Sequence, residues 1–333
     1  MDVMKFTQAV SRIWVLENRL LDKTKVERMI ESTSASEVLR ILNETEYANV
    51  SSNVKRAEDY EEILTAELKR IYDLVYEMSP VKEIVKIMSL KYDYHNAKVL
   101  LKAKVLGKDL SSMLIKLGNL DLQEVKRKID SDDLKSLNGI LGKGIQEAMK
   151  VFEETKDPQK IDIIIDKYMY EELVEINKSL DYKFIDNLVK AMIDSTNIRT
   201  LLRIKKQNKG RGFAEEVIFN GGAIDSNKLI LLLNESPENI MSKLQSTIYS
   251  SLVKEGLEGY IATDSASLLE KLSDNYIMQL MKDSKLVTFG PERLLSYIYA
   301  KETEIKVIRI IMVGKLNNIA EEVIRERLRD IYA

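Results

Sequence analysis

The 333-residue chain contains no cysteine, and His95 is its only histidine. The absence of cysteine excludes disulfide bonds, thiolate nucleophiles and cysteine-ligated metals, and a single imidazole excludes a multi-histidine metal site. We also find no cofactor-binding motif. We therefore expect no metal, no cofactor and no small-molecule substrate.

Glycine and proline are scarce, with 13 and 4 residues, whereas charged residues make up 31% of the chain. Such a composition is typical of long, solvated helices because the two strongest helix breakers are rare. The formal net charge is only −2. No global positive field therefore favours nucleic acid or an anionic lipid surface.

Long apolar runs are also missing. Leu229–Leu233 is among the longest, far below the roughly 18 residues that a membrane-spanning helix needs. The start of the chain, Met1–Phe6, lacks the charged-then-apolar pattern of a signal peptide. We expect a cytoplasmic protein.

Two stretches about a hundred residues apart share one pattern, Asp-x-x-Asn-apolar-basic-x-Leu-Leu-basic-x-Lys. They are Asp93–Lys104 and Asp194–Lys205, and each is followed by a glycine, Gly107 and Gly210. A third, degraded copy is Glu304–Arg309, with Gly314 soon after.

Each copy predicts a helix, because its apolar residues recur at i, i+3 and i+4. The acidic and amide side chains lie beside that apolar stripe, so we expect them to enter a helix–helix contact and to be hydrogen bonded there. This structural polar network would comprise Asp93, Asn96, Asp194 and Asn197. A binding or catalytic site is the alternative, but the copies recur without a partner residue for chemistry, which favours the structural interpretation.

Local signals elsewhere predict an all-α fold. We expect helices at 6–21 and 57–78, a helix from the capping box Ser34–Glu37 to Leu42, and a polar break over 43–53. The β-branched segment Ile161–Ile165 is interpreted as buried helix. A capping-type residue precedes every proline, which places the prolines at helix starts: Ser79-Pro80, Asp157-Pro158, Ser236-Pro237 and Gly290-Pro291.

A second signal repeats in the same order along the chain. Leu42-x-x-Thr45-x-Tyr47 recurs as Leu244-x-x-Thr247-x-Tyr249, and loosely as Phe152-x-x-Thr155-x-Asp157. Asp166-x-Tyr168 likewise recurs as Asp274-x-Tyr276. Their common order predicts three related helical modules: 1–112, 113–215 and 216–333.

Motifs that invite a catalytic interpretation are weak. Gly139–Gly144 lacks the Gly-Lys-Ser/Thr ending of a phosphate loop and is interpreted as a helix-connecting turn. Lys209–Gly212 is interpreted as a helix C-cap. His95 has no serine or carboxylate at a spacing that would indicate a catalytic site, and it is interpreted as a helix-surface or packing residue. Adjacent carboxylates such as Glu61-Glu62 and Glu321-Glu322 do not face each other on a helix and are interpreted as solvated surface.

Basic residues gather on the three related helices, and four of them are our candidates for contacts with a partner: Lys102, Arg199, Arg203 and Arg309. Solvated helix faces are the default interpretation. Nucleic acid is disfavoured by the net charge and by the lack of interleaved aromatic platforms. A protein–protein socket is the functional option that survives.

The motifs together match those of a known family. The chain resembles the C subunit of the V/A-type ATPases and ATP synthases, whose counterpart in eukaryotic V-ATPases is the d subunit. The resemblance runs nearly end to end, and the order and spacing of its moderately specific motifs make it strong. It is carried by Ser11–Leu21, Asp93–Gly107, Asp194–Lys205, Phe219–Gly222 and Lys301–Ile308.

The resemblance implies three similar helical domains around a pseudo-threefold axis, shaped like a funnel. It implies a central-stalk subunit on the inner, cytoplasmic face of the membrane, held there through protein contacts. The funnel would receive the lower end of the rotor shaft and pass torque between the shaft and the proteolipid ring for proton or sodium transport. It also implies no active site, because ATP chemistry belongs to other subunits. Glu304 and Arg309 depart from the repeated pattern, which argues against strict threefold equivalence.

Two alternatives come from other classes of protein. A helical-repeat adaptor that binds acidic proteins or RNA would use the same basic helices, and its RNA binding would weaken steeply with salt. A hydrolase would need a site that no motif indicates.

Overall fold

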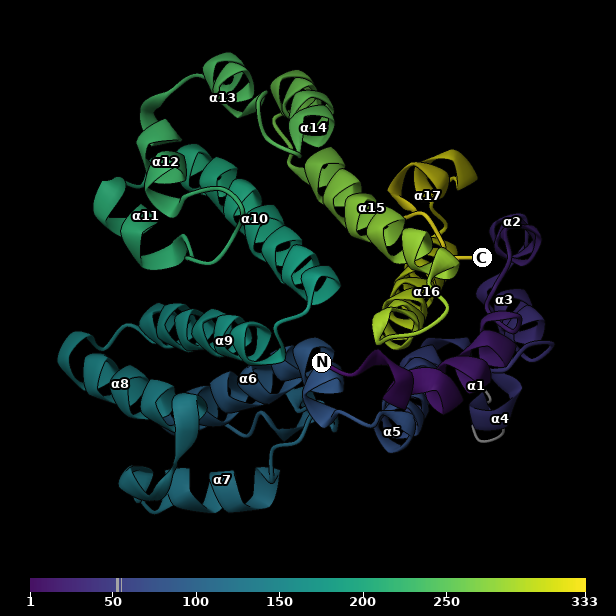
Figure 1. The fold of residues 1–333 in the computed structure, drawn as a ribbon, viewed down its shortest axis with the longest axis horizontal. Helices are drawn as coiled ribbons and strands as arrows, with labels where there is room; N and C mark the ends of the chain where they lie inside the picture. Colours follow the sequence, from purple (N-terminus) through teal and green to yellow (C-terminus); the bar gives the residue numbers. More distant parts are fainter. Residues whose placement is uncertain (52–53, 55) are drawn as a thin grey trace. The chain divides into compact units, whose positions relative to one another are not determined.

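The protein is described by a computed structural model over residues 1–51, 54 and 56–333, and that part of the chain is helical, without strands (Figure 1). The all-α prediction is confirmed for these residues. They divide into two compact units, Met1–Val85 with Lys271–Ala333, and Lys86–Glu270. The finer division into three modules stays a prediction.

The first unit is built around one central helix, α16 (Glu292–Leu316). Sixteen of its 25 residues are buried, as expected for a helix that neighbours cover on most sides. α1, α2, α3, α5 and α17 pack against it. The helices of this unit besides α16 are α1 (Thr7–Glu17), α2 (Lys23–Ile30), α3 (Ala35–Leu42), α4 (Ala48–Ser51), α5 (Tyr60–Met78) and α17 (Glu321–Arg327), with 3-10 turns at Val3–Phe6, Ala57–Asp59 and Ser284–Leu286.

The second unit contains two further long helices, α9 (Pro158–Leu180) and α10 (Lys183–Lys206), which pack against each other. α8 lies along α9, as Figure 1 shows. The remaining helices are α7 (Leu122–Asp130), α8 (Gly139–Thr155), α11 (Arg211–Val217), α12 (Ser226–Leu231), α13 (Pro237–Leu244) and α14 (Ser250–Thr263), with 3-10 turns at Ser111–Met113, Leu134–Ser136 and Leu232–Asn234. α6 (Lys82–Leu106) and α15 (Ser267–Asp283) each belong partly to both units.

Most of the local start signals act as predicted. The Ser34 hydroxyl accepts the Glu37 N–H at 3.3 Å, and the Glu37 carboxylate accepts the Thr33 N–H at 2.9 Å, so α3 begins with a capping box. The helix predicted from residue 6 ends early, at Glu17. The polar break contains the short helix α4, and its residues 52 and 53 lie outside the described residues.

The prolines follow the predicted pattern only in part. Asp157 and Ser236 cap α9 and α13, whose first residues are Pro158 and Pro237. α6 begins two residues after Pro80, however, and Pro291 is itself the cap of α16. The segment Ile161–Ile165 lies in α9, and three of its isoleucines are buried, which confirms the buried-helix interpretation.

The turn predicted at Gly139–Gly144 is wrong, because these residues form the start of α8. Gly142 and Gly144 are needed for close packing, whereas Gly139 has open space around it and a φ of +76°. A Cβ on Gly142 would overlap the carbonyl group of Leu137, and one on Gly144 would stand 2.9 Å from the Tyr168 ring. At the end of α10 the left-handed conformation is taken by Asn208, with φ 52°, while Gly210 caps α11.

We expect Gly142→Ala to lower the unfolding free energy by about 1–3 kcal/mol, because the added methyl group meets backbone that cannot rotate away. Gly212→Ala in α11 is the matched control, since nothing lies within 4 Å of its Cβ. That substitution should be neutral or stabilise the helix by up to about 1 kcal/mol. Urea unfolding of both variants measures the difference, and equal stabilities would refute the packing role of Gly142.

Candidate functional site

Asp93 and Asn96 on α6 bind the backbone of the segment that follows this helix. The Asp93 carboxylate accepts the N–H groups of Asn119 and Leu120, both at 3.0 Å. The Asn96 amide accepts the Ile115 N–H at 2.8 Å and donates to the Ile115 carbonyl at 2.7 Å. Both side chains are buried. We call such a buried carboxylate on a long helix, together with the backbone it binds, an anchor.

α10 carries a second anchor with the same geometry. The Asp194 carboxylate accepts the N–H groups of Ala223 and Ile224 at 2.8 and 3.2 Å. The Asn197 amide exchanges two hydrogen bonds with Phe219, at 2.9 Å from its N–H and 2.8 Å to its carbonyl. The partners are thus the backbones of connecting segments, where we had expected another helix. Such segments offer N–H groups that no helix satisfies.

Both anchors fix the start of the next helix. Leu120 and Ile224 each precede a capping aspartate, Asp121 of α7 and Asp225 of α12. In both anchors the long helix therefore binds the residue that precedes the N-cap of a later helix.

Two glycines make room for these carboxylates. A Cβ on Gly118 would overlap the Asp93 carboxylate, and a Cβ on Gly222 would overlap that of Asp194. The role of Gly118 was not predicted from the sequence. A glycine two residues before a Leu/Ile-Asp pair was the signal that could have found both positions.

α16 holds a third anchor, although its sequence is different. The Glu304 carboxylate accepts the Leu21 N–H at 2.6 Å, and Leu21 precedes Asp22, the capping residue of α2. Glu304 stands at the asparagine position of the repeat but makes the hydrogen bond that the aspartates make elsewhere. The aspartate position itself is taken by Lys301. This anchor joins residues 283 positions apart in the chain.

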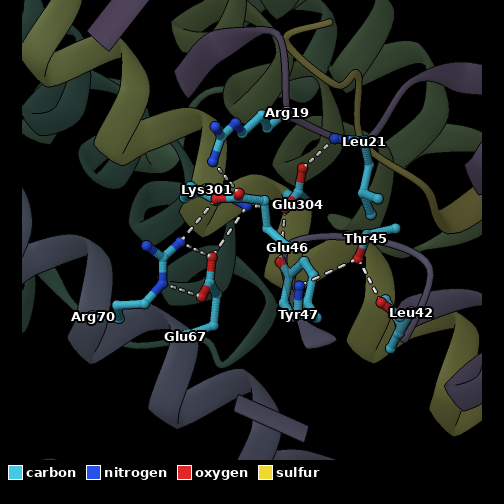
Figure 2. A network of polar contacts seen from close by, with 10 residues as sticks. All are labelled: Arg19, Leu21, Leu42, Thr45, Glu46, Tyr47, Glu67, Arg70, Lys301 and Glu304. Carbon is cyan, nitrogen blue, oxygen red and sulfur yellow. Dashed lines mark hydrogen bonds and ion pairs between the residues drawn. The ribbon is translucent and has the colours of Figure 1, made fainter. Parts of the chain in front are cut away.

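A network of alternating charges, buried at Lys301 and exposed at Arg19, surrounds the third anchor (Figure 2). The Lys301 ammonium lies 2.8 Å from a Glu304 oxygen and 3.3 Å from a Glu67 oxygen, and all three side chains are at most 4% exposed. Glu67 pairs with Arg70, and Arg70 and Arg19 both pair with Glu46. Three cations therefore face three carboxylates. A pairing of this kind offsets the large cost of burying charge.

A tyrosine lies beside the anchor carboxylate in two of the three anchors. The Tyr47 hydroxyl donates to Glu304 at 2.8 Å, and Tyr249 lies close enough to Asp194 to oppose the rise in the pKa of that carboxylate. Each tyrosine is presented by the same turn, in which a threonine hydroxyl donates to a leucine carbonyl and accepts the tyrosine N–H. This geometry explains why Leu-x-x-Thr-x-Tyr repeats in the sequence. The loose third copy has Asp157 in place of the tyrosine, and there it caps α9.

Burial and charge shift the proton affinities of these groups. Burial raises the pKa of Tyr47 well above its usual range, and the Glu304 carboxylate raises it further. Burial alone would lower the pKa of Lys301, but Glu304 and Glu67 outweigh it and raise that pKa. Burial also raises the pKa of Asp93 and of Asp194, against the opposing effect of their hydrogen bonds.

The four candidate contact residues already have partners within the chain. Lys102 pairs with Asp162 at 2.6 Å, and Arg309 pairs with Glu61 at 2.6 Å. Arg199 donates to the Ser195 carbonyl at 3.1 Å. Arg203 has the longest ion pair, 3.8 Å to Glu270, and is 66% exposed. A partner carboxylate would therefore compete most easily for Arg203.

The remaining candidates for chemistry have structural surroundings. His95 Nε2 is within 2.9 Å of the Met113 carbonyl, so this histidine packs on the segment after α6. Glu61 pairs with Arg309 and Glu321 with Arg325. Among the described residues we find no cluster of potential metal ligands and no helix with the length and apolarity to cross a membrane. The arrangement of the three anchors is suited to holding segments in place.

We expect Asn197→Leu to cost about 2–5 kcal/mol of unfolding free energy, because it leaves the N–H and carbonyl of Phe219 without partners. Asn187→Leu is the control, since that asparagine is exposed on the same helix. Thermal unfolding followed by circular dichroism measures both. An unchanged midpoint for Asn197→Leu would contradict the role of the second anchor.

We also expect the protein to lose stability at alkaline pH. The folded protein keeps the protons on Tyr47 and Lys301 where the unfolded chain, with ordinary pKa values of 10.0 and 10.5, has released them. The native state then binds more protons than the unfolded state, so the unfolding free energy falls as pH rises above about 10.

Tyr47→Phe removes one of these two protons. Above pH 10 the unfolding free energy of the variant should therefore fall less steeply than that of the wild type, and the two slopes should differ by at most about 1.4 kcal/mol per pH unit. Urea titrations between pH 8 and 11 measure this slope, with the exposed Tyr76→Phe as control. Parallel curves for the wild type and Tyr47→Phe would overturn the assignment.

Comparisons with known proteins agree with the resemblance. Residues 9–327 match the family described as ATP synthase (C/AC39) subunit. The C subunit of the V-type sodium ATPase of Enterococcus hirae is 31% identical, over 95% of each chain. The C subunit of the A-type ATP synthase of Methanocaldococcus jannaschii is 28% identical, over 98% of this chain and 87% of its own. The C subunit of the A-type ATP synthase of Thermococcus kodakarensis is 23% identical, over 96% of this chain and 89% of its own. The chain therefore belongs to the ATP synthase (C/AC39) subunit family, a family of non-catalytic subunits of the rotary complex.

Proposed function

We propose that the chain is a central-stalk subunit of a V/A-type rotary ATPase. In this proposal it is a socket that couples the rotor shaft to the membrane proteolipid ring for ATP-linked proton or sodium transport. It would lie on the cytoplasmic face of the membrane and be held there by protein contacts. The observation that carries the proposal, beyond the family, is the anchor that recurs on α6, α10 and α16.

A subunit that transmits torque between two partners must keep its structure under load. The anchors favour this, because pulling a segment away from its helix leaves a carboxylate and several N–H groups buried without partners. The charged network around Lys301 acts in the same direction. Breaking a buried pair by losing one partner costs about 3–5 kcal/mol.

The repeated anchor also supports three related modules, at 1–112, 113–215 and 216–333, in a pseudo-threefold funnel. Each long helix holds the segment leading into a short helix, and that helix belongs to the following module. α16 holds the corresponding segment of the first module. The third anchor uses Glu304 and Lys301, so the modules would be related without being equivalent, which suits an asymmetric shaft.

Co-purification from native membranes tests this function. The tagged chain should be recovered with a small membrane-embedded ring protein and a coiled-coil shaft protein, and intact-complex mass spectrometry identifies both. Recovery as a free monomer, or with RNA, would contradict the proposal.

Charge reversal at Arg199 and Arg203 should weaken partner retention without unfolding the chain. Contacts of exposed charges are worth about 1 kcal/mol, so a several-fold loss is expected, and it should grow at low salt. Arg40→Glu is the control, because Arg40, like Arg203, is highly exposed, and it has a carboxylate partner on its own helix. Unfolding of the Arg199 and Arg203 variants would instead make these residues structural.

A further inference from the structure

An open groove of about 800 Å³ lies in the second unit. One face of α9 forms its floor, α8 forms one wall, and α11 with residues 218–221 forms the other. None of the anchors' side chains lines it, and none of the four candidate contact residues does. We call it the α9 groove.

The α9 groove has the length and periodicity of a helix-binding site. Its floor residues run from Lys160 to Lys178 at helical spacing, about 27 Å at 1.5 Å per residue. Its centre is apolar, with Ile163 and Val174 partly exposed. A helix that lays an apolar face into such a groove makes contacts at i, i+3, i+4 and i+7.

The walls of the groove are held in place before any partner arrives. Phe219, which Asn197 holds through its backbone, stacks on Tyr170 with ring centroids 4.2 Å apart. Gly221 lies so close to Val174 that a Cβ would overlap it. A preformed site avoids the cost of ordering its walls on binding.

The rim of the groove is acidic. It carries three lysines, of which Lys160 is already paired with Glu216 at 2.7 Å. It carries five glutamates, of which Glu215 is paired with Arg211 at 2.8 Å: Glu147, Glu171, Glu175, Glu215 and Glu216. This excess of negative charge disfavours lipid phosphates and RNA, and it favours a partner with basic residues beside its apolar face.

We infer that the α9 groove binds a single amphipathic α-helix of another subunit, with an apolar face against Ile163 and Val174 and with lysines or arginines beside Glu171 and Glu175. The inference rests on the proposed function only in placing this partner within the rotary complex. The size of the groove and its net charge define the ligand independently of that complex.

The direct test is photo-cross-linking in the assembled complex. A photoreactive residue at exposed position 175 should cross-link to a helical segment of another subunit that has apolar residues at i, i+3 and i+4 and basic flanks. A photoreactive residue at Glu153, exposed on α8 outside the groove, is the control. A cross-link from position 175 to a second copy of this chain, to lipid, to RNA or to nothing would overturn the inference.

A second test uses the purified chain and a labelled 18-residue helical peptide with leucines on one face and lysines beside them. Glu171→Lys/Glu175→Lys should weaken its binding at least tenfold and strengthen binding of the same peptide with glutamates in place of the lysines. Glu153→Lys/Glu154→Lys, a matched exposed pair outside the groove, should leave both affinities unchanged. Equal affinities for the two peptides, or equal effects of the two double variants, would refute the electrostatic match.

The two proposals fail in different ways. If the chain co-purifies with the ring and shaft proteins but position 175 cross-links to no helix, the groove inference is wrong and the proposed socket function is still supported. If the chain never joins such a complex but the purified protein selects the basic peptide through Glu171 and Glu175, the socket is wrong and the helix-binding groove stands.

Discussion

The structure depends on one interaction, a buried carboxylate on a long helix that accepts backbone N–H groups from a connecting segment. It occurs at Asp93, Asp194 and Glu304. Each of these carboxylates binds the N–H of the residue before a helix-capping aspartate, so one hydrogen bond sets where the next helix begins. Burial makes the interaction costly to break, because neither the carboxylate nor the N–H would find water at that position.

The third anchor shows how the same geometry survives a change of sequence. On α6 and α10 an Asp and an Asn side chain both bind the backbone of the connecting segment. On α16 the longer side chain of Glu304 reaches the N–H of Leu21 from the asparagine position. Lys301 then stands at the aspartate position and needs carboxylates of its own, which Glu67 and Glu304 supply. The buried pairs of Lys301 with Glu67 and Glu304 follow from these two changes of residue type.

Much of this could be predicted from the sequence, and the rest has a physical reason for being hidden. Periodicity and capping residues predicted the helices, including the buried segment of α9, because those signals are local. The resemblance to the C subunits of rotary ATPases was carried by the order of the motifs. The partners of Asp93 and Asp194 were not predicted, since backbone groups 26 to 30 residues away leave no residue-type signature. The start of α8 was mistaken for a turn because Gly142 and Gly144 serve packing against Leu137 and Tyr168, which only the folded chain brings close.

Amide hydrogen exchange of Leu21, Leu120 and Ile224 tests the equivalence of the three anchors most directly. Each N–H is bound to a buried carboxylate, so all three should exchange slowly, at rates set by opening of the surrounding core. Ser251 serves as the internal reference, because it is exposed in the first turn of α14, where N–H groups have no carbonyl partner within the helix. Comparable protection at the three positions is the predicted result. Fast exchange at Leu21 beside slow exchange at Leu120 and Ile224 would contradict the account, because Glu304 would then not do what the two aspartates do.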